Sequence, residues 1–241
     1  MLQRKGSQWL FQVELRQLTE ELTEMALVAE ELFSASARAL VGRDRFLARQ
    51  VAEGAGVVPF EDEAGENVHA RTLELLQEWV SFEGHVRSLL MIQQSATELE
   101  RIGDHARRIA THALALTIGT EPHLPSLGRD IGSDLLALIR ALAAQLRGCA
   151  EMLAAPETER AQQLAAADAE IDRIYLRLVA ALQEAMSQTP EWALLLTRLL
   201  FAVHEMECIG NRVGNICENI SYMLAYWEPA DTSNGGSRAA I

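Results

Sequence analysis

Glu100 and Asp104 are two acidic residues whose spacing could bind a cation. They are four residues apart, so on a helix their carboxylates lie on the same face, within roughly 6 Å of each other. Because like charges at this separation repel, the pair favours a cation nearby. Arg107 and Arg108 follow Asp104 by three and four residues, which is the favourable order for an acid and a base on a helix. A salt-bridged surface therefore accounts for this pair without a metal ion.

A second pair, Asp168 and Asp172, repeats the spacing in the C-terminal half. If the neighbouring helices run antiparallel, Asp168 and Asp172 lie opposite Glu207 and Asn211, and four oxygen donors face one another. Such oxygen clusters suit Mg²⁺, Ca²⁺, Mn²⁺ or oxygen-ligated iron rather than a thiolate-bound zinc ion. The sequence therefore offers a candidate metal site, with a solvated acidic surface as the alternative.

Glu66 and His69 form one E-x-x-H pair, the spacing that di-iron helical bundles use. A di-iron site needs this pair twice together with two more glutamates, but His204 and Glu207 stand in the reverse order. This argues against a ferritin-like oxidase. The sequence also contains no glycine-rich phosphate loop, nucleotide fingerprint or Ser-His-Asp candidate set. No motif predicts catalysis, so we expect a protein that is not an enzyme.

The chain has three cysteines, and their placement favours a reducing compartment. Cys208 and Cys217 are nine residues apart on one expected helix, too far for a disulfide. Neither has a neighbouring base or a C-x-x-C partner, so we expect inert buried thiols. No stretch of eighteen residues is free of charge, and the opening residues lack the apolar core of a secretory signal. We therefore expect a cytoplasmic protein without direct membrane insertion.

The elements that must position these residues are helices. Apolar residues make up 49% of the chain and aromatic residues only 5%; the apolar residues are mostly Ala and Leu, which favours helices over strands. Gly42 is expected to end the first helix, and Asp44 to cap the next. In chain order, we expect helices over residues 11–40, about 45–80 with an uncertain middle near Pro59, 82–118, 128–153, 157–187 and 190–227.

The two halves of the chain resemble each other. Residues 100–110, ERIGDHARRIA, align with residues 207–217, ECIGNRVGNIC, at an offset of 107 residues, which indicates a duplication. The two Gly and two Pro of residues 119–128 mark a boundary between the halves. We predict an all-α protein of two tandem pseudo-symmetric three-helix bundles. The predicted bundles span residues 1–120 and 121–227, and residues 228–241 form a tail that we expect to be disordered.

The charge of the chain excludes two classes of partner. The formal net charge is −13, from 21 Lys and Arg against 34 Asp and Glu. Nucleic acids and anionic lipids attract basic surfaces, so an acidic chain of this kind is not expected to bind either of them.

Two segments resemble the signature helices of the PhoU family of phosphate-signalling regulators. They are ELERIGDHARRIATHAL at 98–114 and ECIGNRVGNICENISY at 207–222. The segment DAEID at 168–172 precedes the second signature at the distance seen in that family. The resemblance covers nearly the whole chain except the tail.

The resemblance implies a regulator without catalytic activity. PhoU proteins couple a high-affinity phosphate ABC transporter to a sensor histidine kinase, and they keep the phosphate-starvation response off when phosphate is plentiful. The implied partners are the ATPase subunit of the phosphate transporter and the phosphate-sensing histidine kinase. The sequence does not decide whether the protein forms a homodimer.

Some members of the family bind metal clusters through E/DxxxD motifs. Carried over by position, Glu100 and Asp104 belong to the first cluster, and Asp168, Asp172 and Glu207 to the second.

This chain departs from the family pattern in both halves. In the first half the matching acids would fall near Ala55 and Pro59, and in the second half the last acid is Asn211. The displaced substitutes in the first half are Glu61, Asp62, Glu63 and Glu66. Because a multinuclear cluster needs that negative charge, we expect a divalent or iron ion to bind weakly as a single ion, or not at all.

The sequence leaves three functions open. The first is a non-catalytic adaptor that keeps the phosphate-starvation response off. The second is a metal-binding bundle, either a metal store or an oxygen-dependent carboxylate enzyme, that uses the five acids of the two clusters. The third is a PhoU-like paralogue that regulates another transporter.

Overall fold

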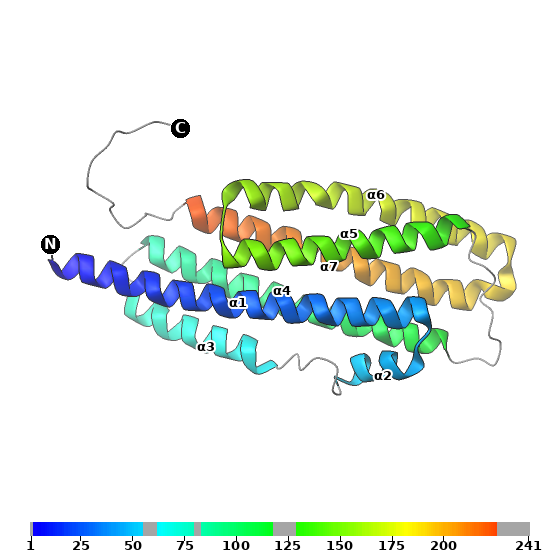
Figure 1. Ribbon diagram of the computed structural model, residues 1–241, viewed down its shortest axis with the longest axis horizontal. Helices are drawn as coiled ribbons and strands as arrows, with labels where there is room; N and C mark the ends of the chain where they lie inside the picture. Colours follow the sequence, from blue (N-terminus) through cyan, green and yellow to red (C-terminus); the bar gives the residue numbers. More distant parts are fainter. Residues whose placement is uncertain (1, 55–61, 80–82, 118–128, 226–241) are drawn as a thin grey trace.

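The computed structural model describes residues 2–54, 62–79, 83–117 and 129–225. Within these ranges the chain is helical and contains no strand (Figure 1). The helices are α1 (Leu2–Gly42), α2 (Arg45–Glu53), α3 (Asp62–Trp79), α4 (Glu83–Leu116), α5 (Arg129–Ala154), α6 (Thr158–Gln188) and α7 (Ala193–Ala225), with a short 3₁₀ helix, η1 (Pro190–Trp192), before α7. The predicted all-α class is confirmed.

The junction between α1 and α2 follows the predicted capping signals with one change. The Asp44 carboxylate accepts hydrogen bonds from the backbone N–H groups of Phe46 and Leu47, both at 3.0 Å, and so caps α2. The residue that leaves the helical conformation is Arg43, with a φ of 50°, rather than Gly42, which is the last residue of α1. Gly54, with a φ of 69°, ends α2 in the left-handed conformation that favours glycine.

The second helix of the first half is divided into α2 and α3. The sequence predicts one helix with an uncertain middle, and that middle, including Ala55, Pro59 and Glu61, lies outside the described residues. The division matters for the site because α3 is a separate helix from α2. Which residues of α3 face α4 therefore cannot be inferred from the register of α2.

The two halves repeat one arrangement. In the first half α1, α2 and α3 pack against α4, and in the second half α5 and α6 pack against α7. The halves lie side by side because α4 packs along α7 and α1 along α5 (Figure 1). This is the predicted pair of three-helix bundles, with the middle helix of the first bundle broken. The exact borders, at 120 and 227, and the tail fall outside the described residues and stay predictions.

The core consists mainly of leucine, isoleucine and alanine from every long helix. On α1 the buried face includes Leu15, Leu18 and Leu22. The helices α4 and α7 carry matching buried residues, such as Ile102 and Ile209. Burial of each such side chain contributes about 1.5–3 kcal/mol. Among the described residues, no helix is both long enough and apolar enough to cross a membrane.

Candidate functional site

The acids of the second half come together where α6 packs on α7. Asp168 and Asp172 lie on α6, and Glu207 and Asn211 lie on α7. The close approach occurs at Gly210, where a Cβ atom would lie 3.2 Å from Asp168 Oδ1. The glycine inside a strong helix is therefore explained by packing, because α6 and its carboxylate occupy the space that a side chain would take.

The pKa of Asp168 is raised by its surroundings. Burial raises its pKa, the negative charge of Asp172 raises it further, and Glu207 adds to the rise. Asp168 therefore faces α7 at Gly210, as the antiparallel order of the two helices predicts. Asp168 Oδ1 is buried and makes no hydrogen bond with any residue that the structure describes.

Gln145 of α5 completes the buried side of this cluster. Its side chain is 2% exposed, and neither atom of its amide has a hydrogen-bond partner among the described residues. The amide lies close enough to Asp168 to oppose the rise in the pKa of that carboxyl. A buried amide and a buried carboxylate oxygen without partners are costly. Among the described residues, however, Asp168, Asp172 and Glu207 do not form a group whose ligand atoms all lie within 4.8 Å of one another, so a shared metal ion at these three acids stays a prediction.

Among the described residues, the acids of the first half have other partners than those of the second half. Glu100 Oε1 lies 3.4 Å from His69 Nε2 of α3. One turn earlier, Gly65 packs so closely that a Cβ atom there would collide with Glu100 Oε1. Asp104 is 56% exposed and lies 3.4 Å from Arg107 Nη1, as the simpler sequence interpretation expects.

The internal repeat explains the loss of charge in the first half. The offset of 107 residues places Gly65 where the second half has Asp172. The same offset matches Glu61, which lies outside the described residues, with Asp168. The expectation that the matching positions are Ala55 and Pro59 is therefore wrong, and Glu66, next to Gly65, is exposed. Among the described residues of the first half, the donors around Glu100 do not fit a multinuclear cluster.

The structure adds two residues to the second site. His204 Nδ1 lies 3.5 Å from Glu207 Oε2, and Cys208 Sγ lies 3.8 Å from His204 Nε2. The expectation that Cys208 has no neighbouring base is therefore wrong. The H-x-x-x-C spacing could have revealed this, because residues four apart share a helix face.

Cys217 matches the prediction of an inert thiol, and Cys149, for which the sequence made no prediction, has the same surroundings. Cys149 and Cys217 are buried. Burial raises the pKa of Cys217 to about 12 and also raises that of Cys149, so both stay protonated at neutral pH. Cys208 is only partly buried.

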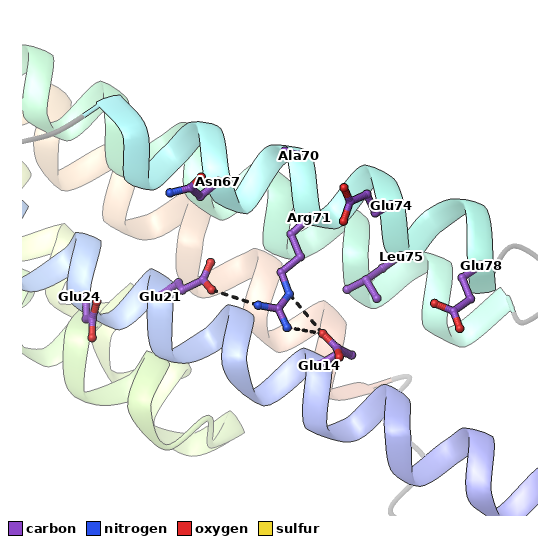
Figure 2. Close-up of a pocket in the computed structure, with 9 residues that line it drawn as sticks. All are labelled: Glu14, Glu21, Glu24, Asn67, Ala70, Arg71, Glu74, Leu75 and Glu78. Atoms are coloured by element: carbon purple, nitrogen blue, oxygen red, sulfur yellow. Dashed lines mark hydrogen bonds and ion pairs between the residues drawn. The ribbon is translucent and has the colours of Figure 1, made fainter.

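An acidic cavity of about 810 Å³ opens between α1 and α3 (Figure 2). Arg71 of α3 reaches across it to Glu14, with Nε 3.2 Å from Oε2, and to Glu21, with Nη1 3.6 Å from Oε1. Four further lining residues are polar: Glu24, Asn67, Glu74 and Glu78. Glu14 and Glu21 lie on the edge of α1 that faces α3. The cavity presents five carboxylates and one guanidinium to solvent.

Comparisons with known proteins agree with this repeated architecture. Residues 22–113 and 135–220 each match the family model described as PhoU domain. The phosphate-specific transport system accessory protein PhoU homolog of Rhizobium meliloti is 29% identical over 91% of this chain and 89% of its own length. The phosphate-specific transport system accessory protein PhoU of Escherichia coli is 27% identical over 89% of this chain and 85% of its own length.

Two solved structures share the fold. The crystal structure of PhoU from Pseudomonas aeruginosa gives a TM-score of 0.79 at 23% identity, covering 89% of this chain and 99% of that one. The phosphate transport system regulatory protein PhoU from Streptococcus pneumoniae gives a TM-score of 0.72 at 21% identity, covering 89% and 96%.

Proposed function

The chain belongs to the PhoU family, and on that premise we propose that it is a cytoplasmic accessory protein of phosphate transport. The observation that carries the proposal is the match of both halves to the family domain. Relatives named for the phosphate-specific transport system align over about nine-tenths of the chain, so the proposal covers the whole two-bundle body.

The finer proposal is an adaptor that acts without turning over a substrate. It binds the ATPase subunit of a phosphate ABC transporter and a phosphate-sensing histidine kinase, and it favours one conformation of each. Such an adaptor shifts the populations of its partners' states by its difference in affinity for them. When phosphate is plentiful, the favoured state of the kinase keeps the starvation response off.

The acidic surface supports this mechanism. The net charge of −13 and the five carboxylates of the cavity between α1 and α3 attract basic surfaces on a partner. Electrostatic attraction of this kind raises the association rate and is screened by salt. Association with a basic partner surface therefore slows as the ionic strength rises.

Deletion of the gene in a strain that carries a phosphate-starvation reporter tests the adaptor. The intact gene should silence the reporter at high phosphate, and the deletion should release it. Failure of the intact gene to silence the reporter contradicts the regulatory proposal.

Complementation with two double variants tests the carboxylates in the same strain. Glu100→Ala/Asp104→Ala removes the acids of the first half, and Asp168→Ala/Asp172→Ala removes those of the second. Glu53→Ala, at an exposed and distant surface position, is the control. If both double variants silence the reporter as the control does, the carboxylates are dispensable for regulation.

A second proposal concerns the metal. We propose that Asp168, Asp172 and Glu207 bind one divalent or iron ion weakly. The support is the buried Asp168 Oδ1, which makes no hydrogen bond with a described residue. Metal analysis after purification without chelator, followed by titration with Mn²⁺ and Fe²⁺, measures it. Tight stoichiometric metal together with oxygen-dependent turnover would instead favour the metal store or carboxylate enzyme.

A PhoU-like paralogue that serves another transporter is the remaining alternative. In that case the deletion leaves the phosphate reporter silent and changes the uptake of a different anion. Uptake assays with phosphate and with other oxyanions in the deletion strain distinguish the two.

A further inference from the structure

One face of α7 carries three different metal-binding side chains side by side. His204, Glu207 and Cys208 each offer one ligand atom, and these atoms all lie within 4.8 Å of one another. The spacing i, i+3 and i+4 places all three on one helix face. Only Glu207 belongs to the E/DxxxD motifs; His204 and Cys208 lie outside them.

Asn211 holds the Glu207 carboxylate in a suitable orientation. The Asn211 side-chain amide donates to Glu207 Oε1 at 2.6 Å. The other oxygen, Oε2, then points to the remaining two side chains, 3.5 Å from His204 Nδ1 and 3.7 Å from Cys208 Sγ. A neighbour that fixes one oxygen of a carboxylate in this way orients the other toward a metal.

Tyr175 of α6 holds the His204 imidazole. Its hydroxyl oxygen lies 3.3 Å from His204 Nδ1, while Nε2 lies on the Cys208 side, 3.8 Å from Sγ. A metal-bound histidine commonly donates its second N–H to a neighbouring oxygen. Nδ1–H then faces the Tyr175 hydroxyl and, at 3.5 Å, Glu207 Oε2, and Nε2, on the Cys208 side, is left for a metal.

We propose that His204, Glu207 and Cys208 bind a single Zn²⁺ ion on the surface of α7. A thiolate, an imidazole and one carboxylate oxygen form a typical ligand set for this ion, whose fourth position takes water. Tetrahedral bonds of about 2.0–2.3 Å place zinc ligands about 3.5 Å apart. The 3.7 and 3.8 Å separations of Sγ from its two neighbours are within a few tenths of an ångström of that value.

Binding exchanges a proton for the metal. Cys208 Sγ loses its proton to solvent as the Zn–S bond forms, and the imidazole Nε2 and carboxylate Oε2 donate lone pairs without further bond breaking. The His204 side chain is 54% exposed, so the ion can enter directly from solvent. Glu207 also belongs to the oxygen cluster, the three acids Asp168, Asp172 and Glu207 that are proposed above to bind a divalent or iron ion. Zinc bound by Glu207, His204 and Cys208 therefore takes one of the three ligands away from that ion.

Titration of the full chain with Zn²⁺ and with Co²⁺ tests the site. Co²⁺ bound to a thiolate gives an intense near-ultraviolet charge-transfer absorption, whereas Co²⁺ bound by carboxylates alone does not. We expect this absorption in the parent protein at one ion per chain. Cys208→Ser should abolish it, and both Cys208→Ser and His204→Gln should weaken Zn²⁺ binding by about tenfold or more.

Two control variants separate this site from the rest of the protein. Cys217→Ala removes a buried thiol elsewhere on α7, and Asp172→Asn removes charge from the oxygen cluster; both should keep the cobalt absorption. Circular dichroism verifies that every variant is folded. Absence of the absorption in the parent protein, its persistence in Cys208→Ser, or loss of Zn²⁺ binding only in Asp172→Asn overturns the proposal. None of these results depends on the phosphate reporter.

Discussion

Gly210 and Gly214 lie about one turn apart on α7 but meet different surroundings. A Cβ atom at Gly214 would meet nothing within 4 Å, whereas one at Gly210 would lie 3.2 Å from Asp168 Oδ1 and 3.4 Å from Ile171 Cγ2. A comparison of alanine substitutions at the two glycines therefore tests how closely α6 packs on α7 beside Asp168.

We predict that Gly214→Ala stabilises the protein by about 0.5–1 kcal/mol, because alanine in a helix interior loses less backbone entropy than glycine. Gly210→Ala makes the same backbone gain, but it must push the Asp168 carboxylate and Ile171 aside. It should therefore be less stable than Gly214→Ala by about 1 kcal/mol or more. Urea unfolding followed by circular dichroism gives both values. Equal stabilisation by the two substitutions would show that α6 does not pack on Gly210.

The acids of the second half could be predicted from sequence, but their neighbours could not. The antiparallel order of α6 and α7 suffices to place Asp168 against α7, beside Gly210. A metal ion shared by Asp168, Asp172 and Glu207 stays a prediction. Gln145 gives no such signal, because a buried amide on an amphipathic helix has the same sequence pattern as an exposed one. Gly65 was missed because the register of α3 depends on the break after α2, which helical periodicity does not resolve.

At the scale of helices, α4 and α7 join the two halves through polar contacts at the edges of an apolar interface. His105 Nδ1 of α4 lies 2.6 Å from Glu205 Oε2 of α7. Glu98 of α4 is 12% exposed and accepts from Arg212 of α7 at 3.2 Å and from Arg101 at 2.9 Å. The signature helices of the two halves therefore also bind each other.

We predict that Glu98→Ala lowers the free energy of unfolding by about 1–3 kcal/mol. The substitution leaves the half-buried Arg212 guanidinium without its carboxylate across the interface, and hydrogen bonds to charged groups are worth about that much. Glu53→Ala breaks an exposed pair with Arg49 and should change stability by no more than about 0.5 kcal/mol. Denaturant titration of both variants tests this. A Glu98→Ala variant as stable as the control would mean that the charges at this interface are already screened by water.

Helix boundaries were predictable where a cap or a proline marks them and less so elsewhere. Asp44 and Pro190 coincide with real starts of helices, since their chemistry is local. The packing of α4 on α7 could not be predicted from the sequence. Apolar periodicity shows that a helix has a buried face, but it does not show whether a helix of the same half or of the other half covers that face.

At the scale of the whole molecule, the interface between the halves should make them unfold together. Besides the contacts of α4 with α7, α1 packs along α5, and Arg147 of α5 lies 3.3 Å from Glu30 of α1. Each half buries part of its apolar surface only against the other. Loss of one half therefore exposes apolar surface on the remaining half and destabilises it.

We predict a single cooperative thermal transition that substitutions in either half shift as a whole. Leu18→Ala in α1 and Leu178→Ala in α6 each remove a fully buried side chain, at a cost of about 2–5 kcal/mol. At about 2–4 °C for each kcal/mol in a chain of this size, each variant should lower the one Tm by several degrees. Leu194→Ala, at a position that is 73% exposed, should leave it unchanged. Scanning calorimetry distinguishes this from independent bundles, because a second transition that appears in Leu18→Ala while half of the heat absorption stays at the parent Tm requires two separate cores.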